Sequence, residues 1–252
     1  APRRLWYLRA GVSSRAAGIT ERYYAFGPAP GGFQVGNPTL DPEKKWEGEA
    51  GVTLSGEKLS VAVSGVYSGI GDYILPTVIA VMDVNNEGVD DQVKGFENIE
   101  ATMAGGELGL EYRPLSRLYL PVTVSYVRGR NTTGDRDLPE IPPLSGTAEL
   151  RYLAHDRTGT WLRMGAYFAA DQDKIDPLFP EDRTGGYAVW HVGLETEPVR
   201  GLEVRLMVDN LFDRLYSNHL TREALLPTGG LAAGQEIPAP GRGFNVSARM
   251  EF

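Results

Sequence analysis

Leu202-Glu203-Val204-Arg205-Leu206-Met207-Val208-Asp209 places an apolar residue at every second position and a polar or charged residue between most of them. A period of two is that of a β-strand with one apolar and one polar face. The run from Phe244 to Phe252 alternates in the same way, and no polar tail follows it. We therefore expect the outer face of these two strands to meet lipid.

Eight further segments alternate in the same way and bring the predicted number of strands to ten. They are residues 4–14, 46–54, 59–67 (extending toward 73), 96–112, 118–126, 144–153, 162–168 and 188–194. The connections between successive strands are alternately long and short, and the long ones are rich in Gly, Pro and charge. Membrane barrels have short periplasmic turns and long outer loops, and ten strands place both ends of the sheet on the short-turn side.

Composition excludes several classes of protein. The 252 residues carry a net charge of −8, with 31 Gly, 17 Pro and no Cys, so disulfides and thiolate metal sites are excluded. No basic block points to nucleic acid. No apolar run approaches the roughly 20 residues of a membrane helix, and no helix is predicted.

Aromatic residues gather near the predicted strand ends, where a membrane barrel places its two interfacial girdles. Strand aromatics also pack in ordinary cores, but the charged opposite faces favour the girdle. The residues concerned are Trp6, Trp46, Tyr67, Tyr112, Tyr119, Tyr126, Tyr152, Phe168, Trp190, Phe244 and Phe252.

Three motifs carry a resemblance to a known family. The first is Val208-Asp209-Asn210-Leu211-Phe212-Asp213-Arg214-Leu215-Tyr216, followed by Pro240-Gly241-Arg242-Gly243-Phe244 and the terminal Phe252. The others are Gly36-Asn37-Pro38-Thr39-Leu40-Asp41-Pro42-Glu43 and Ile141-Pro142-Pro143-Leu144-Ser145-Gly146. Together they resemble the C-terminal part of TonB-dependent outer-membrane receptors, in the order that this family has.

The resemblance implies an all-β, antiparallel, up-and-down transmembrane barrel. Because the family closes its barrel at 22 strands, about ten strands over residues 1–252 are expected to be the C-terminal portion, without the plug domain. The implied function is TonB-dependent uptake of a siderophore-iron complex, copper or a similar nutrient across the outer membrane of a Gram-negative bacterium. The partners implied are lipid, a metal chelate, and the TonB complex acting through a plug; no cofactor is expected.

Candidate ligand-binding residues lie in the long loops and at the loop ends of strands, where polar and aromatic groups converge over a barrel mouth. They are Tyr23, Tyr24, Phe26, Tyr73, His219 and Arg222. A weaker soft-metal set faces inward by parity and comprises Met103, His191 and Met207. The run Asn218-His219-Leu220-Thr221-Arg222 also resembles the copper-receptor branch of the family. For all of these residues, ordinary packing is the alternative.

Enzymatic motifs are absent from the sequence, so no catalytic residues are assigned. Asp213 and His219 form the one acid–histidine combination near a mouth, and their spacing is not a catalytic signature. Two other readings stay open. One is a self-contained ten-strand barrel that acts as a passive pore or hydrolase, and the other is a soluble β-sandwich that binds a ligand.

Overall fold

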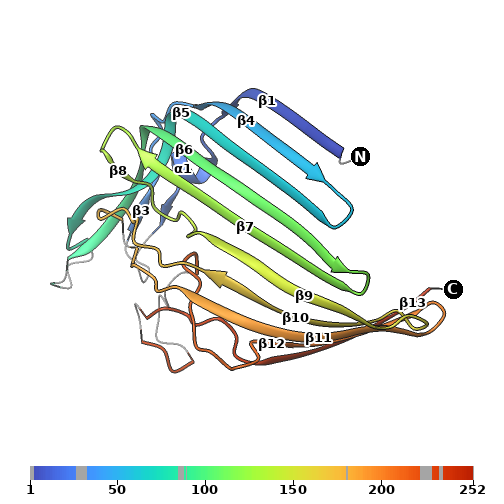
Figure 1. Ribbon diagram of the computed structural model, residues 1–252. Coiled ribbons are helices and arrows are strands. Elements are labelled where there is room, and N and C mark those ends of the chain that lie inside the picture. The colour runs from blue at the N-terminus through green and yellow to red at the C-terminus, as the bar shows by residue number, and fades with distance from the viewer. Residues whose placement is uncertain are drawn as a thin grey trace.

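The computed structural model describes residues 3–26, 33–84, 88, 90–179, 181–221, 229–232 and 235–251. Within them the chain forms one curved sheet, and its ten main strands follow one another in antiparallel order (Figure 1). These are β1 (Arg3–Arg15), β4 (Glu43–Ser55), β5 (Leu59–Met82), β6 (Asp91–Leu115), β7 (Leu118–Asn131), β9 (Ser145–His155), β10 (Thr160–Ala169), β11 (Tyr187–Val199), β12 (Leu202–Asp209) and β13 (Gly243–Met250). The prediction of ten antiparallel strands is confirmed.

Three short strands and one helix lie at the end of the sheet that carries the long loops. The strands are β2 (Ala25–Phe26), β3 (Phe33–Val35) and β8 (Arg136–Asp137), and β3 pairs in parallel with β6. The helix, α1 (Ile19–Tyr23), contradicts the expectation of no helix. It has only five residues, too few for a recognisable apolar period, and Glu21 Oε2 accepts the Gly18 N–H at 2.5 Å. Among the described residues, no helix is long and apolar enough to cross a membrane.

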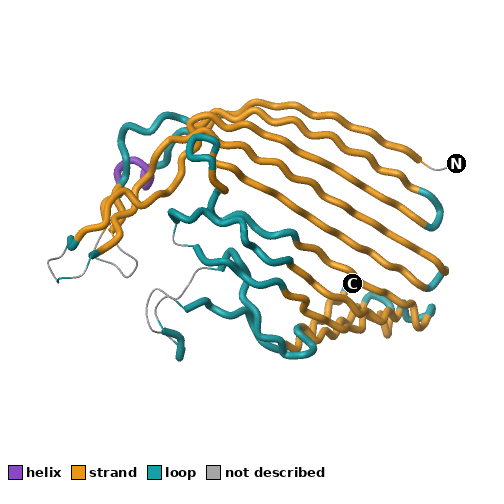
Figure 2. Tube along the Cα trace, turned by 60° about the vertical axis from the view of Figure 1, so that its left-hand side comes forward, coloured by secondary structure: helices purple, strands orange, loops and turns teal. Residues whose placement is uncertain are grey.

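The outer face of the sheet is apolar and uncovered. Leu150, Leu162 and Leu206 lie on inner strands of the sheet, yet they remain 42%, 44% and 43% exposed. Figure 2 shows the strands as a single layer, with no second sheet stacked on either face. The alternation read from the sequence is therefore that of a lipid-facing sheet rather than a soluble sandwich.

One of the aromatic residues assigned to the girdles faces the other way. Tyr119 lies on the inner face, because it pairs with Arg151 of β9 between the apolar positions of β7. The guanidinium carbons of Arg113 and Arg151 lie 4.9 Å and 5.6 Å from the centre of its ring. Cation–π contact on a polar wall, rather than a lipid interface, explains this aromatic residue.

The first residue of β1 and the last residue of β13 both lie at the end of the sheet that carries the short turns. Arg3 at the start of β1 pairs with Ser55, next to the turn at residues 56–58. Met250 at the end of β13 pairs with Leu202, next to the turn at residues 200–201. The long connections gather at the opposite end, at the left in Figure 1. This is the arrangement that the alternating connection lengths predicted.

The sheet is open, which rules out the alternative of a closed ten-strand barrel. Among the described residues, β1 pairs only with β4, and β13 only with β12. The curvature carries the strands through part of a circle, as Figure 1 shows. In lipid, the backbone groups at both edges need partners, because each unsatisfied group costs several kcal/mol.

A long loop expected at residues 75–95 is instead mostly strand. β5 continues to Met82 and β6 begins at Asp91, so the two form a hairpin that projects beyond the neighbouring strands. A register shift around Asp72, which has a φ of 57°, breaks the alternation there. Pro76 makes the rest of β5 look unlike a strand in the sequence. In the structure it nevertheless lies in register with Phe96 of β6. The long loop at residues 128–143 likewise begins later, because β7 runs to Asn131.

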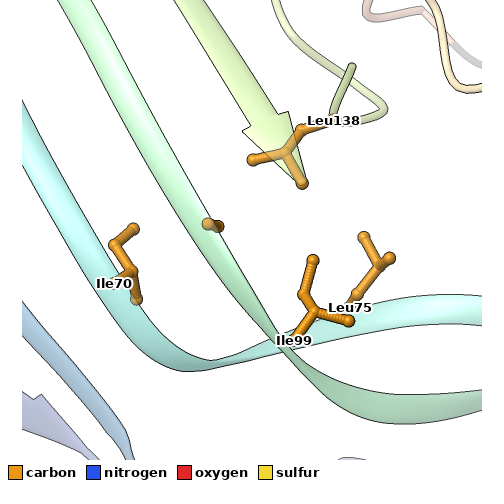
Figure 3. Packing of buried hydrophobic residues seen from close by; sticks show 5 residues of the cluster. Ile70, Leu75, Ile99 and Leu138 are labelled. Atoms are coloured by element: carbon orange, nitrogen blue, oxygen red, sulfur yellow. The ribbon is translucent and has the colours of Figure 1, made fainter. Parts of the chain in front are cut away.

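The apolar core is small and lies at the loop end. Its buried residues are Ile70, Leu75, Ile99, Ala101 and Leu138, and Figure 3 shows four of these labelled side chains turned toward one another. Tyr73, Met103 and Ile141 pack against it. The cluster fixes the base of the β5–β6 hairpin against the loop that carries β8.

Candidate functional site

Charged side chains of alternating sign line the inner face of β9 to β12. Arg163 of β10 donates from Nε to Glu149 Oε1 at 2.8 Å and from Nη1 to Glu195 Oε2 at 3.3 Å. Arg151 pairs with Glu149, and Arg205 Nε donates to Glu195 Oε2 at 3.1 Å. Each carboxylate therefore lies between two guanidinium groups. Charged groups arranged in this way suit the wall of a water-filled lumen, where they need no buried apolar surroundings.

Three tyrosines form a row where this wall meets the long loops. The rings of Tyr167 on β10 and Tyr187 on β11 are centred 5.8 Å apart. Tyr216, in the loop between β12 and β13, adds a third ring 4.5 Å from that of Tyr187. Tilted contacts at these spacings are favourable between aromatic rings. The row joins the lumen wall to the outer loops, with the buried Tyr187 at its centre.

Two of the three soft-metal candidates lie on the adjoining strands β11 and β12, where Met207 pairs with Gly193, two residues after His191. His191 Nε2 is 3.4 Å from Glu149 Oε2, and the ring covers Gly165. Met207 places its sulfur over Gly193 of the adjoining strand β11. Met103 instead packs on the apolar cluster at β6, with β7, β9 and β10 between it and β11. The structure therefore places His191 and Met207 on adjoining strands and Met103 elsewhere.

A buried acid–histidine pair joins the outer loops. His219 Nε2 lies 2.7 Å from Glu181 Oε1, and their side chains are only 1% and 8% exposed. Thr184 Oγ1 is 3.0 Å from His219 Nδ1, and the Glu140 N–H donates to Glu181 Oε1 at 2.9 Å. Glu181 therefore contacts residues of two other long loops, those between β8 and β9 and between β12 and β13.

Burial raises the pKa of the Glu181 carboxyl, and the Glu140 N–H and His219 oppose that rise only in part. A carboxyl group withdrawn from water favours its neutral form unless a positive charge accompanies it. Among the described residues, no three His, Asp or Glu side chains are grouped closely enough to form a ready-made metal site.

The six predicted ligand residues are distributed over different surroundings. Tyr23, on α1, and Tyr24, which follows it, have exposed side chains, whereas Tyr73 packs on the core. Phe26 lies in β2, but its side chain is outside the described part of the structure. Arg222 also lies outside the described residues. His219 is buried rather than solvated.

The sequence offered Asp213 as the acid for His219, with a spacing that is not a catalytic signature. Asp213 Oδ1 accepts the Arg242 N–H at 2.8 Å and so braces the approach to β13. His219 contacts Glu181 instead, so the sequence combination of Asp213 with His219 is not an acid–base pair. Glu181 was not predicted, and neither were Tyr167 and Tyr187. Alternation along β10 and β11 could have placed the two tyrosines on the inner face. Nothing in the loop sequence singles out Glu181.

The fold and this wall agree with a comparison against known families. Residues 2–211 match the family described as TonB dependent receptor-like, beta-barrel. The chain belongs to this family. The TonB-dependent receptor segment is thus an outer-membrane barrel segment of a Gram-negative bacterium, as the sequence predicted.

Individual relatives agree with this assignment. The TonB-dependent heme receptor A of Haemophilus influenzae is 27% identical over 191 residues, covering 68% of this chain and 23% of that protein. The ferric enterobactin receptor PirA of Pseudomonas aeruginosa is 26% identical over 231 residues, covering 88% of this chain and 30% of that protein. Both are described as receptors rather than as enzymes.

The solved structure of the copper transporter OprC superposes with a TM-score of 0.82 at 26% identity, covering 99% of this chain. The receptor segment described here spans 37% of that protein's chain, and still less of the two curated relatives. It therefore corresponds to part of a receptor barrel, and the open edges of the sheet agree with that.

Proposed function

We propose that this segment belongs to a receptor that binds a metal chelate at its outer loops and imports it with energy from TonB. The observation that carries the proposal is the junction of a charged concave wall with the long loops, where Tyr167, Tyr187 and Tyr216 stand in a row. Polar aromatic groups that converge on a mouth are the usual chemistry of a small-molecule site.

Within this proposal, Tyr216 and the exposed Tyr23 and Tyr24 contact the incoming ligand. Tyr73 and His219 are packed, so their contribution is to hold the hairpin and the loops in place. Phe26 and Arg222 remain proposed contacts on sequence grounds. Energy from the TonB complex reaches the barrel through a plug domain, as the family resemblance implies.

For the metal, we propose copper ahead of an iron chelate. The copper transporter superposes on this chain with a TM-score of 0.82, whereas the two relatives found by sequence are named for heme and ferric enterobactin. His191 and Met207 supply an imidazole and a thioether on adjoining strands of the inner face, and such ligands suit copper. Met103 is not included with these two residues, because it packs on the apolar cluster at β6.

Uptake in cells tests the proposal. Cells that carry the complete receptor are given radioactive copper or a radioactive ferric siderophore, with and without a functional TonB. We expect TonB-dependent copper uptake that falls when His191→Ala and Met207→Leu are combined. Copper entry that persists without TonB contradicts active transport and favours a passive pore. TonB-dependent entry of the ferric siderophore alone reverses the choice of metal.

Tyr216→Leu tests the loop contribution separately. Replacement of Tyr216 removes the ring that extends the row into the loop between β12 and β13. We expect weaker binding, seen as a higher ligand concentration at half-maximal uptake, with little change in the abundance of the receptor. Leu215→Ala is the matched control, because Leu215 is 81% exposed and next in sequence. Equal effects of the two changes contradict a role for the row in binding.

A further inference from the structure

Two arginines at the loop end of β7 lie on the lipid-facing side of the sheet. β7 pairs with β6 over residues 120–131 without a register shift, so its two faces alternate without a break along that length. Arg128 and Arg130 therefore share the face of Tyr126, which follows Val124 on that face and is 38% exposed. The face of β7 that meets hydrocarbon thus becomes basic just beyond the aromatic girdle.

A lysine from another loop lies against the same tyrosine. Lys174, between β10 and β11, donates from Nζ to Tyr126 Oη at 3.3 Å, and its Nζ lies 5.6 Å from the centre of the Tyr126 ring. Tyr126, Arg128 and Lys174 also line one recess of about 10 Å³. The exposed lysine is therefore held beside the girdle by a hydrogen bond and a cation–π contact. Two separate segments of the chain bring cations to one place on the outer face.

The carboxylates at this place pair with the arginines and not with the lysine. Asp137 Oδ1 accepts from Arg128 Nε and Nη2, both at 3.2 Å, and Asp135 pairs with Arg130. Lys174 makes no ion pair with any residue that the structure describes. The three cations, here called the basic patch, thus include one ammonium group that can pair with an anion from outside the protein.

The surroundings of the basic patch decide which kind of anion it meets. In an outer-membrane barrel, the outward face just beyond the girdle adjoins the lipid headgroups, where Tyr and Lys keep their apolar parts in lipid and their polar ends outside it. A recess of about 10 Å³ holds at most about one water molecule, so it cannot enclose a phosphate group. An anion must therefore lie on the surface, over Arg128 and Lys174.

The surface beside the patch is apolar and suits acyl chains. Val124 of β7 pairs with Gly146 of β9, and the ring of Phe168 on β10 lies over that glycine. A lipid whose chains lie on this face keeps its headgroup close to Arg128 and Lys174. Attachment of this kind raises the local concentration of the headgroup, which a free anion lacks.

We propose that Arg128, Arg130 and Lys174 bind the phosphorylated headgroup of a lipid of the outer leaflet. Guanidinium and ammonium groups are the side chains that proteins use for phosphate. The chain as a whole carries a net charge of −8, so overall attraction does not bring an anionic lipid to it, and the local patch must do so. Because Lys174 belongs to the loop between β10 and β11, the bound headgroup also joins that loop to β7.

Native mass spectrometry of the complete receptor in a neutral detergent, titrated with diphosphorylated lipid A, tests the site. We expect saturable binding that weakens about fivefold in Lys174→Gln and about fivefold again when Arg128→Gln is added. Lys174→Arg keeps the charge and should bind as the wild type does. Arg157→Gln is the matched control, because Arg157 is exposed in a short turn at the opposite end of the sheet. Absence of saturable binding, or equal effects of Lys174→Gln and Arg157→Gln, overturns the proposal.

Two further titrations separate a lipid from a free anion. Dephosphorylated lipid A has the same acyl chains, and we expect it to bind the wild type and Lys174→Gln equally. Inorganic phosphate alone, titrated by calorimetry, should show no saturable binding to the wild type. Phosphate binding that is lost in Lys174→Gln assigns the patch to a soluble anion and overturns the lipid assignment. Lys174 is exposed, so its replacement keeps the fold, which circular dichroism verifies.

Discussion

Arg163 and Glu149 are joined by two parallel hydrogen bonds across neighbouring strands, Nε to Oε1 at 2.8 Å and Nη2 to Oε2 at 3.1 Å. A two-point contact of this kind is the strongest ion-pair geometry that proteins use. The Glu149 side chain is 11% exposed and also pairs with Arg151. It is therefore the central acid of the charged lumen wall.

Removal of that acid should cost stability. Glu149→Gln leaves the charges of Arg163 and Arg151 without their shared carboxylate, and we expect a loss of about 1 to 3 kcal/mol in the free energy of unfolding. Glu203→Gln is the control, since Glu203 is 45% exposed and should change stability by about 0.5 kcal/mol or less. Urea unfolding of the receptor in lipid vesicles measures both. Equal losses contradict a special role for Glu149.

Two glycines in short turns separate backbone strain from steric contact. Gly201 has a φ of 82°, and a Cβ there would lie 2.5 Å from the carbonyl oxygen of Glu251. Gly159 has a φ of 51° with open space around it. Gly159→Ala should cost about 1 kcal/mol through the left-handed backbone alone. Gly201→Ala should cost about 1 to 3 kcal/mol more, because the carbonyl must also move.

Urea unfolding gives both differences. The comparison is informative because Glu251 N–H donates to Gly201 O at 2.7 Å, which ties the end of β13 to this turn. Movement of that carbonyl therefore loosens an edge strand as well as the turn. If the two alanine variants unfold at the same urea concentration, the contact between the new Cβ at residue 201 and the Glu251 carbonyl is relieved without loss of stability, which contradicts the prediction.

The strands were predictable because their signal is local and repeats along the chain. Leu162 and Met164 alternate with Arg163, and the same period runs through nine other segments, so the ten strands and their faces follow from parity. Parity also predicted that His191 faces inward, where it meets Glu149. The prediction failed at Asp72, because a bulge there reverses the faces and hides the continuation of β5.

The loop site could not be predicted in the same way. Glu181 and His219 are 2.7 Å apart in space but lie in two loops without any repeating pattern. Their contact depends on how the ends of β11 and β12 carry the loops toward each other, and only the folded sheet determines that. Sequence reasoning singled out His219 in a long loop and considered only Asp213 as its acid, so it gave no sign of Glu181.

A second buried loop contact yields a prediction about proteolysis. Asp176, whose side chain is 3% exposed, accepts from Arg136 Nε at 2.9 Å and from the Leu178 N–H at 3.0 Å. Asp176→Ala removes this link between two outer loops. A loss of about 1.4 kcal/mol in loop closure raises the open population tenfold, and trypsin cleavage near Lys174 should accelerate accordingly. Asp173→Asn, at an exposed position, should leave the cleavage rate unchanged.

The pH dependence of the loops follows from Glu181. Burial raises the pKa of its carboxyl above that in the unfolded chain, about 4.3. A raised pKa means that the folded loops bind the proton more tightly, so this contribution to stability is fully present below the unfolded pKa. It is lost as the pH rises through the folded pKa. The loops should therefore loosen across that window.

Spin labels can report this loosening, because the chain has no cysteine of its own. Labels at Asp173→Cys and Leu215→Cys place one probe on each loop, at exposed positions. The distribution of distances between the two labels should broaden as the pH rises above about 4.3. Glu181→Gln keeps the neutral form at every pH and should abolish the change. A pH response that survives in Glu181→Gln assigns the titration to another group.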